Sequence, residues 1–340
     1  MAEIPAMAPE TDSKELLDQV GREAFSFPSS DGATTVVGDL WTPPPTVEPV
    51  LLVQLVHGMA EHIGRYDPFA RALAVRGCVV AGHDHLGHGR SVAEGLPKEE
   101  SWGRFIPNAG AEHLVSDVQS ARLLLDARYP DMPHVMFGHS MGSFVLRTFL
   151  GKHGEGLEGA IVCGTGWQPR AALAVGRAVT SIIGHVRGWG YRSAFVDSLA
   201  AGAYARVFAD AEGGDLAWLT RDAAHRDLYR DDPAAGFVFS VGAYHELFRL
   251  VGFAQDKHIV RGMPSALPVF LIAGSDDPVG GMGAAIPKVA SLMAECGVRD
   301  VEQKLYPGAR HEILNETNRS EVLQDIVDWL RRKGLLNDRQ

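Results

Sequence analysis

The alternation of short apolar runs with helical patterns constrains this 340-residue chain more than any other feature. From residue 50 onward, runs such as VLLVQLV and GAIVCG alternate with longer amphipathic stretches, which is typical of βαβ units. Strands that are apolar on both sides belong to a parallel sheet covered by helices on both faces. Ahead of them, two β-branched and aromatic runs flank Ser30-Asp31-Gly32, which predicts an antiparallel hairpin. We therefore expect an α/β fold with a mostly parallel sheet.

The alternation stops near Gly166 and resumes at LPVFLIAG, residues 267–274. The chain is thus predicted to consist of an amino-terminal extension (1–20), a core made of 21–167 and 256–340, and an inserted helical cap (168–255). The cap holds 12 of the 27 aromatic residues, and its nine arginines balance nine acidic residues. Its aromatic rings either pack among themselves or line an apolar pocket, and the pattern leaves both open.

Several classes of protein are excluded by charge and by missing signals. The net charge of −10 repels phosphate backbones, so we expect no nucleic-acid partner. The amino terminus has an acid at Glu3 and no apolar run, which predicts a cytoplasmic protein. No uninterrupted apolar stretch is long enough to span a bilayer, so any membrane contact would be peripheral. Oligomeric state is left open. The three cysteines lie far apart and are expected to be buried thiols: Cys78, Cys163 and Cys296.

Two further patterns were weighed as cofactor sites. His83, Asp84, His85 and His88 could be a metal cluster, but the segment holds no HExxH pair and follows a strand into a glycine loop. The glycines at 280, 281 and 283 form no complete nucleotide-binding motif. We therefore expect neither a metal nor a cofactor.

The pentapeptide GHSMG, residues 138–142, is the strongest chemical signal. It follows a predicted strand and opens a predicted helix, as a nucleophile elbow does. Small residues are needed two positions on either side of the serine because the turn is tight. The alternative is a plain glycine-rich strand end. We predict that Ser140 is a nucleophile.

A serine nucleophile needs a base and an orienting acid, which follow it along the chain in this kind of fold. Asp277 comes after the predicted strand LPVFLIAG, and His311 comes after VEQKLY. Both lie past the carboxyl ends of strands, where α/β sheets gather their chemistry. For His311 alone, a solvated loop histidine is the alternative. The order Ser, Asp, His predicts a catalytic triad.

An oxyanion hole requires two backbone N–H groups. We expect one from Met141, directly after the nucleophile, and one from Met59 in the loop after VLLVQLV. The alternative for that loop is a simple turn. The polar residues that follow, Glu61, His62, Arg65 and Tyr66, are either a wall of the pocket or a solvated loop held by an ion pair, and we favour the solvated loop.

Five segments together resemble the monoacylglycerol lipase and lysophospholipase family of α/β-hydrolases: HGMAEHIGRYDPFARAL, DHLGHGRS, GHSMGS, AGSDDPVG and YPGARHEILNE. The cap segments WLTRD and YRDDPAAGFVFS are similar to those of its bacterial members. The resemblance implies an α/β-hydrolase fold, the triad Ser140, Asp277 and His311, and oxyanion donors at Met59 and Met141. It places the acid at Asp277 and not at Asp276, and it implies a lid over the pocket and a structural role for the DxxGHG segment. Ala60 departs from the glycine of many relatives.

We therefore expect a serine hydrolase that cleaves a small-molecule carboxylic ester through an acyl-enzyme, with monoacylglycerol or lysophospholipid as substrate. An amidase, peptidase or acyltransferase with the same triad remains an alternative, as does a catalytically silent ligand-binding protein. Cap arginines 170, 177, 187 and 192 could bind a phosphate, but pairing with the nine cap acids is the favoured interpretation. On that basis medium-chain monoacylglycerols should be cleaved faster than lysophospholipids, and triacylglycerols slowest.

Overall fold

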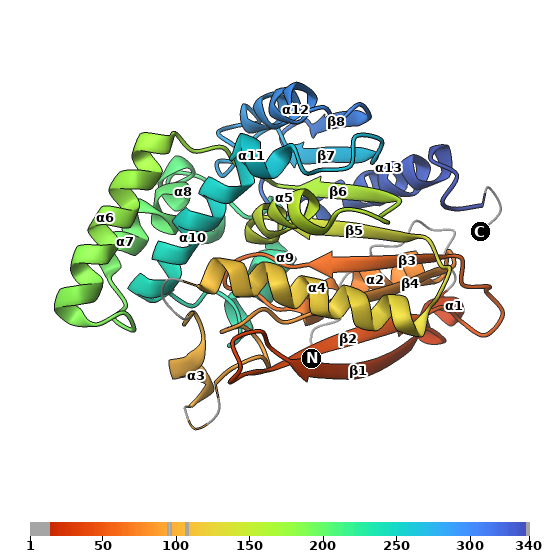
Figure 1. The fold of residues 1–340 in the computed structure, drawn as a ribbon, viewed down its shortest axis with the longest axis horizontal. Coiled ribbons are helices and arrows are strands. Elements are labelled where there is room, and N and C mark those ends of the chain that lie inside the picture. Colours follow the sequence, from red (N-terminus) through yellow and green to blue (C-terminus); the bar gives the residue numbers. More distant parts are fainter. Residues whose placement is uncertain (1–13, 94, 96, 106–108, 338–340) are drawn as a thin grey trace.

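An eight-stranded sheet forms the centre of the protein (Figure 1). The computed structural model describes residues 14–93, 95, 97–105 and 109–337, so most of the expected amino-terminal extension lies outside the described residues. The strands are β1 (Gly21–Pro28), β2 (Thr35–Thr42), β3 (Leu51–Val56), β4 (Cys78–His83), β5 (His134–His139), β6 (Gly159–Cys163), β7 (Val269–Gly274) and β8 (Val301–Tyr306). Their order across the sheet is β1-β2-β4-β3-β5-β6-β7-β8.

The predicted hairpin is confirmed, because β1 and β2 pair antiparallel from Gly21 opposite Thr42 to Pro28 opposite Thr35. The turn between them is closed by Asp31, whose carboxylate accepts hydrogen bonds from the N–H groups of Ala33 and Thr34. The β2–β4 pair is also antiparallel, and every other pair is parallel. The expectation of a mostly parallel sheet is therefore confirmed.

Helices cover both faces of the sheet. Those outside the expected cap are α1 (Lys14–Asp18), α2 (Asp67–Ala74), α3 (Lys98–Ser101), α4 (Gly110–Arg128), α5 (Met141–His153), α11 (Lys257–Val260), α12 (Ala285–Glu295) and α13 (Arg319–Arg332). Alternate side chains of β5 point to opposite faces: Met136 packs in the core with residues of α4, α5 and α12, whereas Val135 and Phe137 pack with residues of α2 and α13. The strands β3 to β7 at the centre of the sheet are fully buried, as their apolar runs predict.

The segment between β6 and β7 is helical. Within residues 168–255 it forms α6 (Arg170–Arg187), α7 (Ala194–Leu199), α8 (Ala201–Val207), α9 (Ala223–Asp231) and α10 (Val241–Ala254). Figure 1 shows α6, α7, α8 and α10 beyond the carboxyl ends of the parallel strands. We call residues 168–255 the cap.

The two ends of the cap are held by a buried arginine of α5. Arg147 is fully buried, and its guanidinium donates to the carbonyls of Gly166 and Ala254 at 3.2 and 2.8 Å. Burial lowers the pKa of Arg147 to about 9. Gln255 adds a two-point contact, because its amide both donates to and accepts from the backbone of Gln168 at 2.8 Å. The two ends of the cap are therefore held together beside α5, the helix that follows Ser140.

Two expectations from composition concern cysteines and membrane spans. All three cysteines are free thiols, and Cys78 and Cys163 are buried as expected, whereas Cys296 is partly exposed. None of the helices within the described ranges is long and apolar enough to cross a membrane.

Candidate active site

Ser140 lies in the sharp turn between β5 and α5. Its φ of +53° is in the left-handed region, which strains a residue that has a Cβ. The flanking glycines are required sterically: a Cβ on Gly142 would lie 2.1 Å from the carbonyl oxygen of Val56, and a Cβ on Gly138 would lie 2.6 Å from that of Gly142. This strand-turn-helix geometry is that of a nucleophile elbow.

His311 and Asp277 lie beside the serine, although both are far from it in sequence. The Nε2 atom of His311 is 2.8 Å from Ser140 Oγ, and its Nδ1 atom is 3.0 Å from each carboxylate oxygen of Asp277. Asp277 and His311 are buried. A carboxylate on Nδ1 favours the tautomer with the proton on Nδ1, so that Nε2 can accept the serine proton. The structure thus brings the three predicted residues into one hydrogen-bonded chain.

Asp276 points elsewhere. Its side chain accepts a hydrogen bond from the hydroxyl of Ser275 at 2.8 Å, and its backbone N–H donates to the carbonyl of Ala309. Of the two adjacent acids, only Asp277 contacts His311.

The expected oxyanion donors flank the serine from two elements. Met141 is the first residue of α5, where backbone N–H groups have no partner within the helix. Met59 lies in the loop after β3, residues 57–61, which we call the oxyanion loop. The N–H of Gly58 in this loop donates to Glu61 Oε1 at 2.5 Å. A Cβ on Gly58 would lie 3.1 Å from the Cβ of Ser140, so glycine is what allows the loop to approach Ser140.

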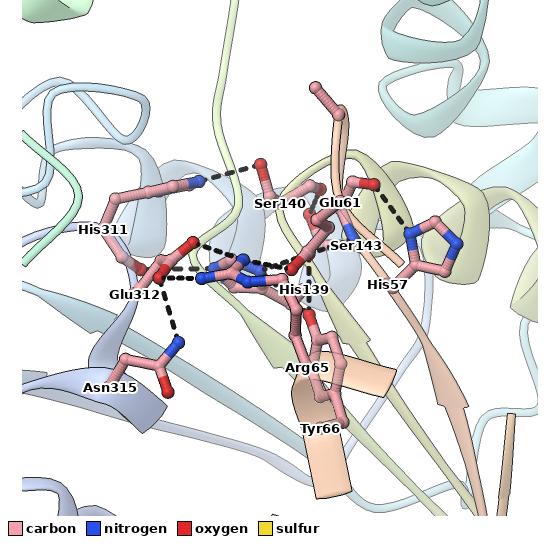
Figure 2. A network of polar contacts seen from close by, with 12 residues as sticks. His57, Glu61, Arg65, Tyr66, His139, Ser140, Ser143, His311, Glu312 and Asn315 are labelled. Atoms are coloured by element: carbon pink, nitrogen blue, oxygen red, sulfur yellow. Dashed lines mark hydrogen bonds and ion pairs between the residues drawn. The ribbon is translucent and has the colours of Figure 1, made fainter. Parts of the chain in front are cut away.

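The interpretation of Glu61, Arg65 and Tyr66 as a solvated loop is wrong. Figure 2 shows them in a polar network below the serine, with Glu61 and Tyr66 buried. Arg65 donates to Glu61 Oε2 at 2.6 Å and to both carboxylate oxygens of Glu312 at 2.8 Å. Since Glu312 directly follows His311, this bidentate contact ties the oxyanion loop to the loop that carries His311.

His139, which precedes Ser140, completes this network. Its Nδ1 atom is 3.4 Å from Glu61 Oε1, and its Nε2 atom is 3.3 Å from the carbonyl oxygen of His311. Burial alone would raise the pKa of Glu61, but the His139 hydrogen bond and the Arg65 charge hold it well below its usual range. Burial lowers the pKa of His139, yet its hydrogen bond to Glu61 leaves that pKa raised overall. The sequence analysis predicted no role for His139 or Glu312. The only sequence feature that could have indicated one is their adjacency to Ser140 and His311.

The histidines of the DxxGHG region form a buried cluster with His57 of the oxyanion loop. The rings of His57 and His85 lie 4.3 Å apart, and those of His57 and His88 lie 5.2 Å apart. Burial lowers the pKa of His83 and of His88 to about 3, so both are neutral at pH 7. Among the described residues no cluster of three or more potential ligands suited to a metal ion is found.

A cavity of about 1120 Å³ lies between the cap and the sheet. Its lining includes Ser140, His311, Met59 and Met141, and apolar residues of α6 and α10 line other parts. Six of the twelve cap aromatics also line it: Tyr204, Trp218, Tyr229, Phe237, Tyr244 and Phe248. The cap rings therefore serve both roles that the sequence left open. The arrangement joins a polar reaction centre to space for an apolar ligand.

Comparison with protein families gives a match over most of the chain. The model of the family described as "Serine aminopeptidase, S33" matches residues 47–318. These limits include Ser140, Asp277 and His311.

Individual relatives are similar at low identity and high coverage. The chain is 26% identical over 319 residues to a monoacylglycerol lipase of Mycolicibacterium smegmatis, covering 91% of this chain and 97% of that protein. It is 26% identical over 299 residues to monoglyceride lipase of Mus musculus, covering 85% and 84%. Among solved structures, a thermostable carboxyl esterase from Bacillus coagulans in complex with glycerol has a TM-score of 0.82 and 27% identity, covering 92% of this chain and 98% of that one. The chain therefore has the α/β-hydrolase fold that its motifs predicted.

Proposed function

The chain belongs to the family described as serine aminopeptidase, S33, and from this premise we propose that it is a serine hydrolase that cleaves carboxylic esters through an acyl-enzyme. One observation carries the proposal: an unbroken chain of hydrogen bonds runs from Asp277 through His311 to Ser140, and it opens into a largely apolar cavity. The similarity to two lipases and an esterase supports the same reaction class.

Acylation begins when His311 Nε2 takes the proton of Ser140 Oγ, which is 2.8 Å away. The Oγ atom then bonds to the ester carbonyl carbon, and the carbonyl oxygen becomes an oxyanion that accepts hydrogen bonds from Met59 and Met141 N–H. Asp277 stabilises the resulting imidazolium. The bond from carbon to the alcohol oxygen breaks, and His311 returns its proton to that oxygen.

Deacylation repeats these steps with water. His311 removes a proton from a water molecule, whose oxygen attacks the acyl carbon of the Ser140 ester. Collapse of the second tetrahedral intermediate releases the carboxylic acid, and the proton on His311 restores the serine hydroxyl. The residues of the chain thus supply a nucleophile, a base and an electrostatic site, and no step requires a cofactor.

Ester cleavage is favoured over removal of an amino-terminal residue. A peptidase of that kind needs a carboxylate to bind the substrate ammonium group next to the serine. Three acids of the polar network and the triad are already engaged: Glu61 and Glu312 bind Arg65, and Asp277 binds His311. The apolar lining instead suits an acyl chain.

We infer that the substrate is a neutral single-chain ester, with medium-chain monoacylglycerol preferred. The expected pairing with cap acids is wrong for Arg170, Arg177 and Arg187. Among the described residues, no ion pair involves Arg170, Arg177 or Arg187, and Arg192 donates to the backbone of Trp102. None of these four arginines lines the cavity, whereas Arg206 of α8 does. The preference for a neutral head group therefore rests on the largely apolar lining.

A comparison of specificity constants tests this proposal. We expect medium-chain monoacylglycerol to be cleaved faster than lysophospholipid of equal chain length, and triacylglycerol slowest, because the substrate must fit between the cap and the sheet. Each methylene that becomes buried contributes about 0.8 kcal/mol to binding, so kcat/KM should rise with chain length. A preference for lysophospholipid that weakens with added salt would refute the neutral-ester proposal.

A further inference from the structure

Ala60, the residue after the expected oxyanion donor Met59, has a backbone conformation that alanine rarely adopts. Its φ is +53°, and it is buried. In this left-handed region the Cβ of an L-residue crowds its own backbone. Such a conformation persists only where the surrounding structure holds it in place.

The contacts that hold Ala60 come from two sides. Its N–H donates to His88 Nε2 at 3.2 Å. Its carbonyl oxygen accepts from the N–H of Gly236 at 2.9 Å and from the hydroxyl of Tyr229 at 3.3 Å. Gly236 and Tyr229 both belong to the cap, so the cap binds the oxyanion loop directly beside Met59.

Asp232 shapes the turn that presents Gly236. Its carboxylate accepts from the N–H of Ala234 at 2.9 Å, and its backbone carbonyl accepts from the N–H of Ala235 at 3.1 Å. The same carboxylate lies 2.7 Å from Nε2 of His62, two residues after Ala60. This side chain therefore fixes the cap turn and anchors it to the loop at the same time.

The same stretch of the cap also binds the backbone of His311 and Glu312. The N–H of His311 donates to the carbonyl of Trp218 at 3.3 Å, and the N–H of Glu312 donates to that of Leu219 at 2.7 Å. Residues 218–236, which we call the inner cap segment, thus contact the backbone of both loops that the reaction needs. The inner cap segment therefore contacts both loops in addition to covering the cavity.

We propose that the inner cap segment positions the oxyanion loop, with Tyr229 and Asp232 as positioning residues that act through Ala60. This inference rests on the proposed ester hydrolysis. The Met59 N–H lies between Gly58, which Glu61 holds, and Ala60, which the cap holds. Fixing both neighbours fixes the direction of the donor, and a preorganised donor is what stabilises an oxyanion.

Two variants weaken these contacts without touching the triad. Tyr229→Phe removes one donor to the Ala60 carbonyl, and Asp232→Ala removes the acceptor that holds the turn and His62. We expect each to lower kcat for a soluble butyrate ester by about tenfold, less than complete loss of an oxyanion donor. The inhibition constant of a trifluoromethyl ketone, which forms an oxyanion on Ser140, should rise by the same factor while KM changes less than twofold. A purely structural defect would not change kcat and the inhibition constant by the same factor.

Matched variants separate positioning from other effects. Asp232→Asn keeps an acceptor oxygen for Ala234 and should retain most of kcat. Adding Ala60→Gly to Tyr229→Phe should restore activity, because glycine adopts a positive φ without strain. Tyr191→Phe changes a cap tyrosine that lies outside the cavity lining and stacks on Arg187, so it should leave kcat and the inhibition constant unchanged.

The outcomes distinguish this inference from the proposed function. Unchanged kcat in both Tyr229→Phe and Asp232→Ala would overturn the positioning role, as would a double variant that is no more active than Tyr229→Phe. A loss confined to KM would make Tyr229, which lines the cavity, a substrate contact and would also overturn it. A wild-type protein that cleaves no ester would refute the proposed function itself.

Discussion

Replacing Asp277 by asparagine should invert the hydrogen bonding of His311. In the native site Asp277 Oδ1 accepts from the N–H of Val279 at 2.9 Å, while both carboxylate oxygens face His311 Nδ1 at 3.0 Å. In Asp277→Asn the Val279 N–H holds the amide oxygen at the Oδ1 position, so the amide NH₂ takes the Oδ2 position, 3.0 Å from Nδ1. Two donors cannot face each other. The imidazole therefore carries its proton on Nε2, toward Ser140, and can no longer act as a base.

The expected loss in kcat is about 10⁴-fold, the size measured when the same tautomer change is made in a serine protease. It corresponds to about 5.4 kcal/mol of transition-state stabilisation. KM should change little, because Asp277 is buried and does not line the cavity.

The assay is steady-state hydrolysis of a soluble butyrate ester, with thermal unfolding as a check that the variant folds. Asp276→Asn is the matched control. Its carboxylate contacts the Ser275 hydroxyl and not His311, so its kcat should fall far less than that of Asp277→Asn. Equal losses in the two variants, or a larger loss in Asp276→Asn, would refute the assignment of the acid.

Two predictions concern stability. Arg65→Met leaves the buried carboxylates of Glu61 and Glu312 without their shared cation, and should lower the free energy of unfolding in urea by about 3–5 kcal/mol. Arg128→Met, which breaks a half-exposed pair with Glu23, should cost less than about 1 kcal/mol, and equal costs would contradict the argument. Burial lowers the pKa of His83 from 6.5 to about 3; between these values only the unfolded chain gains the proton, so stability falls as pH drops from 6.5 toward 3. His83→Phe should make the decline from pH 7 to pH 5 shallower, and an unchanged slope would show that other groups cause it.

The parts of the fold that local patterns encode were predictable. The run HVMFGH forms the buried strand β5, which ends directly before Ser140. The chain then turns into α5, because glycines 138 and 142 leave room for the tight turn. The hairpin at Asp31 was likewise predictable, because its turn chemistry is local.

The rest depends on contacts between distant segments. Arg65 was predicted to lie in a solvated loop, because no residue near it in sequence indicates that it will form a bidentate pair with Glu312. The hydrogen bond from the N–H of Gly236 to the carbonyl of Ala60 could not be predicted either, because it forms only when the cap packs on the oxyanion loop. Sequence patterns reveal which residue types could react, but the charge pairing and the support around them follow from tertiary packing.

Phosphonylation tests the central claim, that Ser140 is an activated nucleophile, most directly. An organophosphonate probe at neutral pH should add one phosphonyl group, which peptide mapping by mass spectrometry places on Ser140, and Ser140→Ala should remain unlabelled. Ser143 is the internal comparison, because its hydroxyl donates to the Ser140 carbonyl at 2.5 Å, and no hydrogen bond to a histidine is found for it in the described part of the chain. An unmodified wild-type protein, or an adduct on Ser143, would contradict the account.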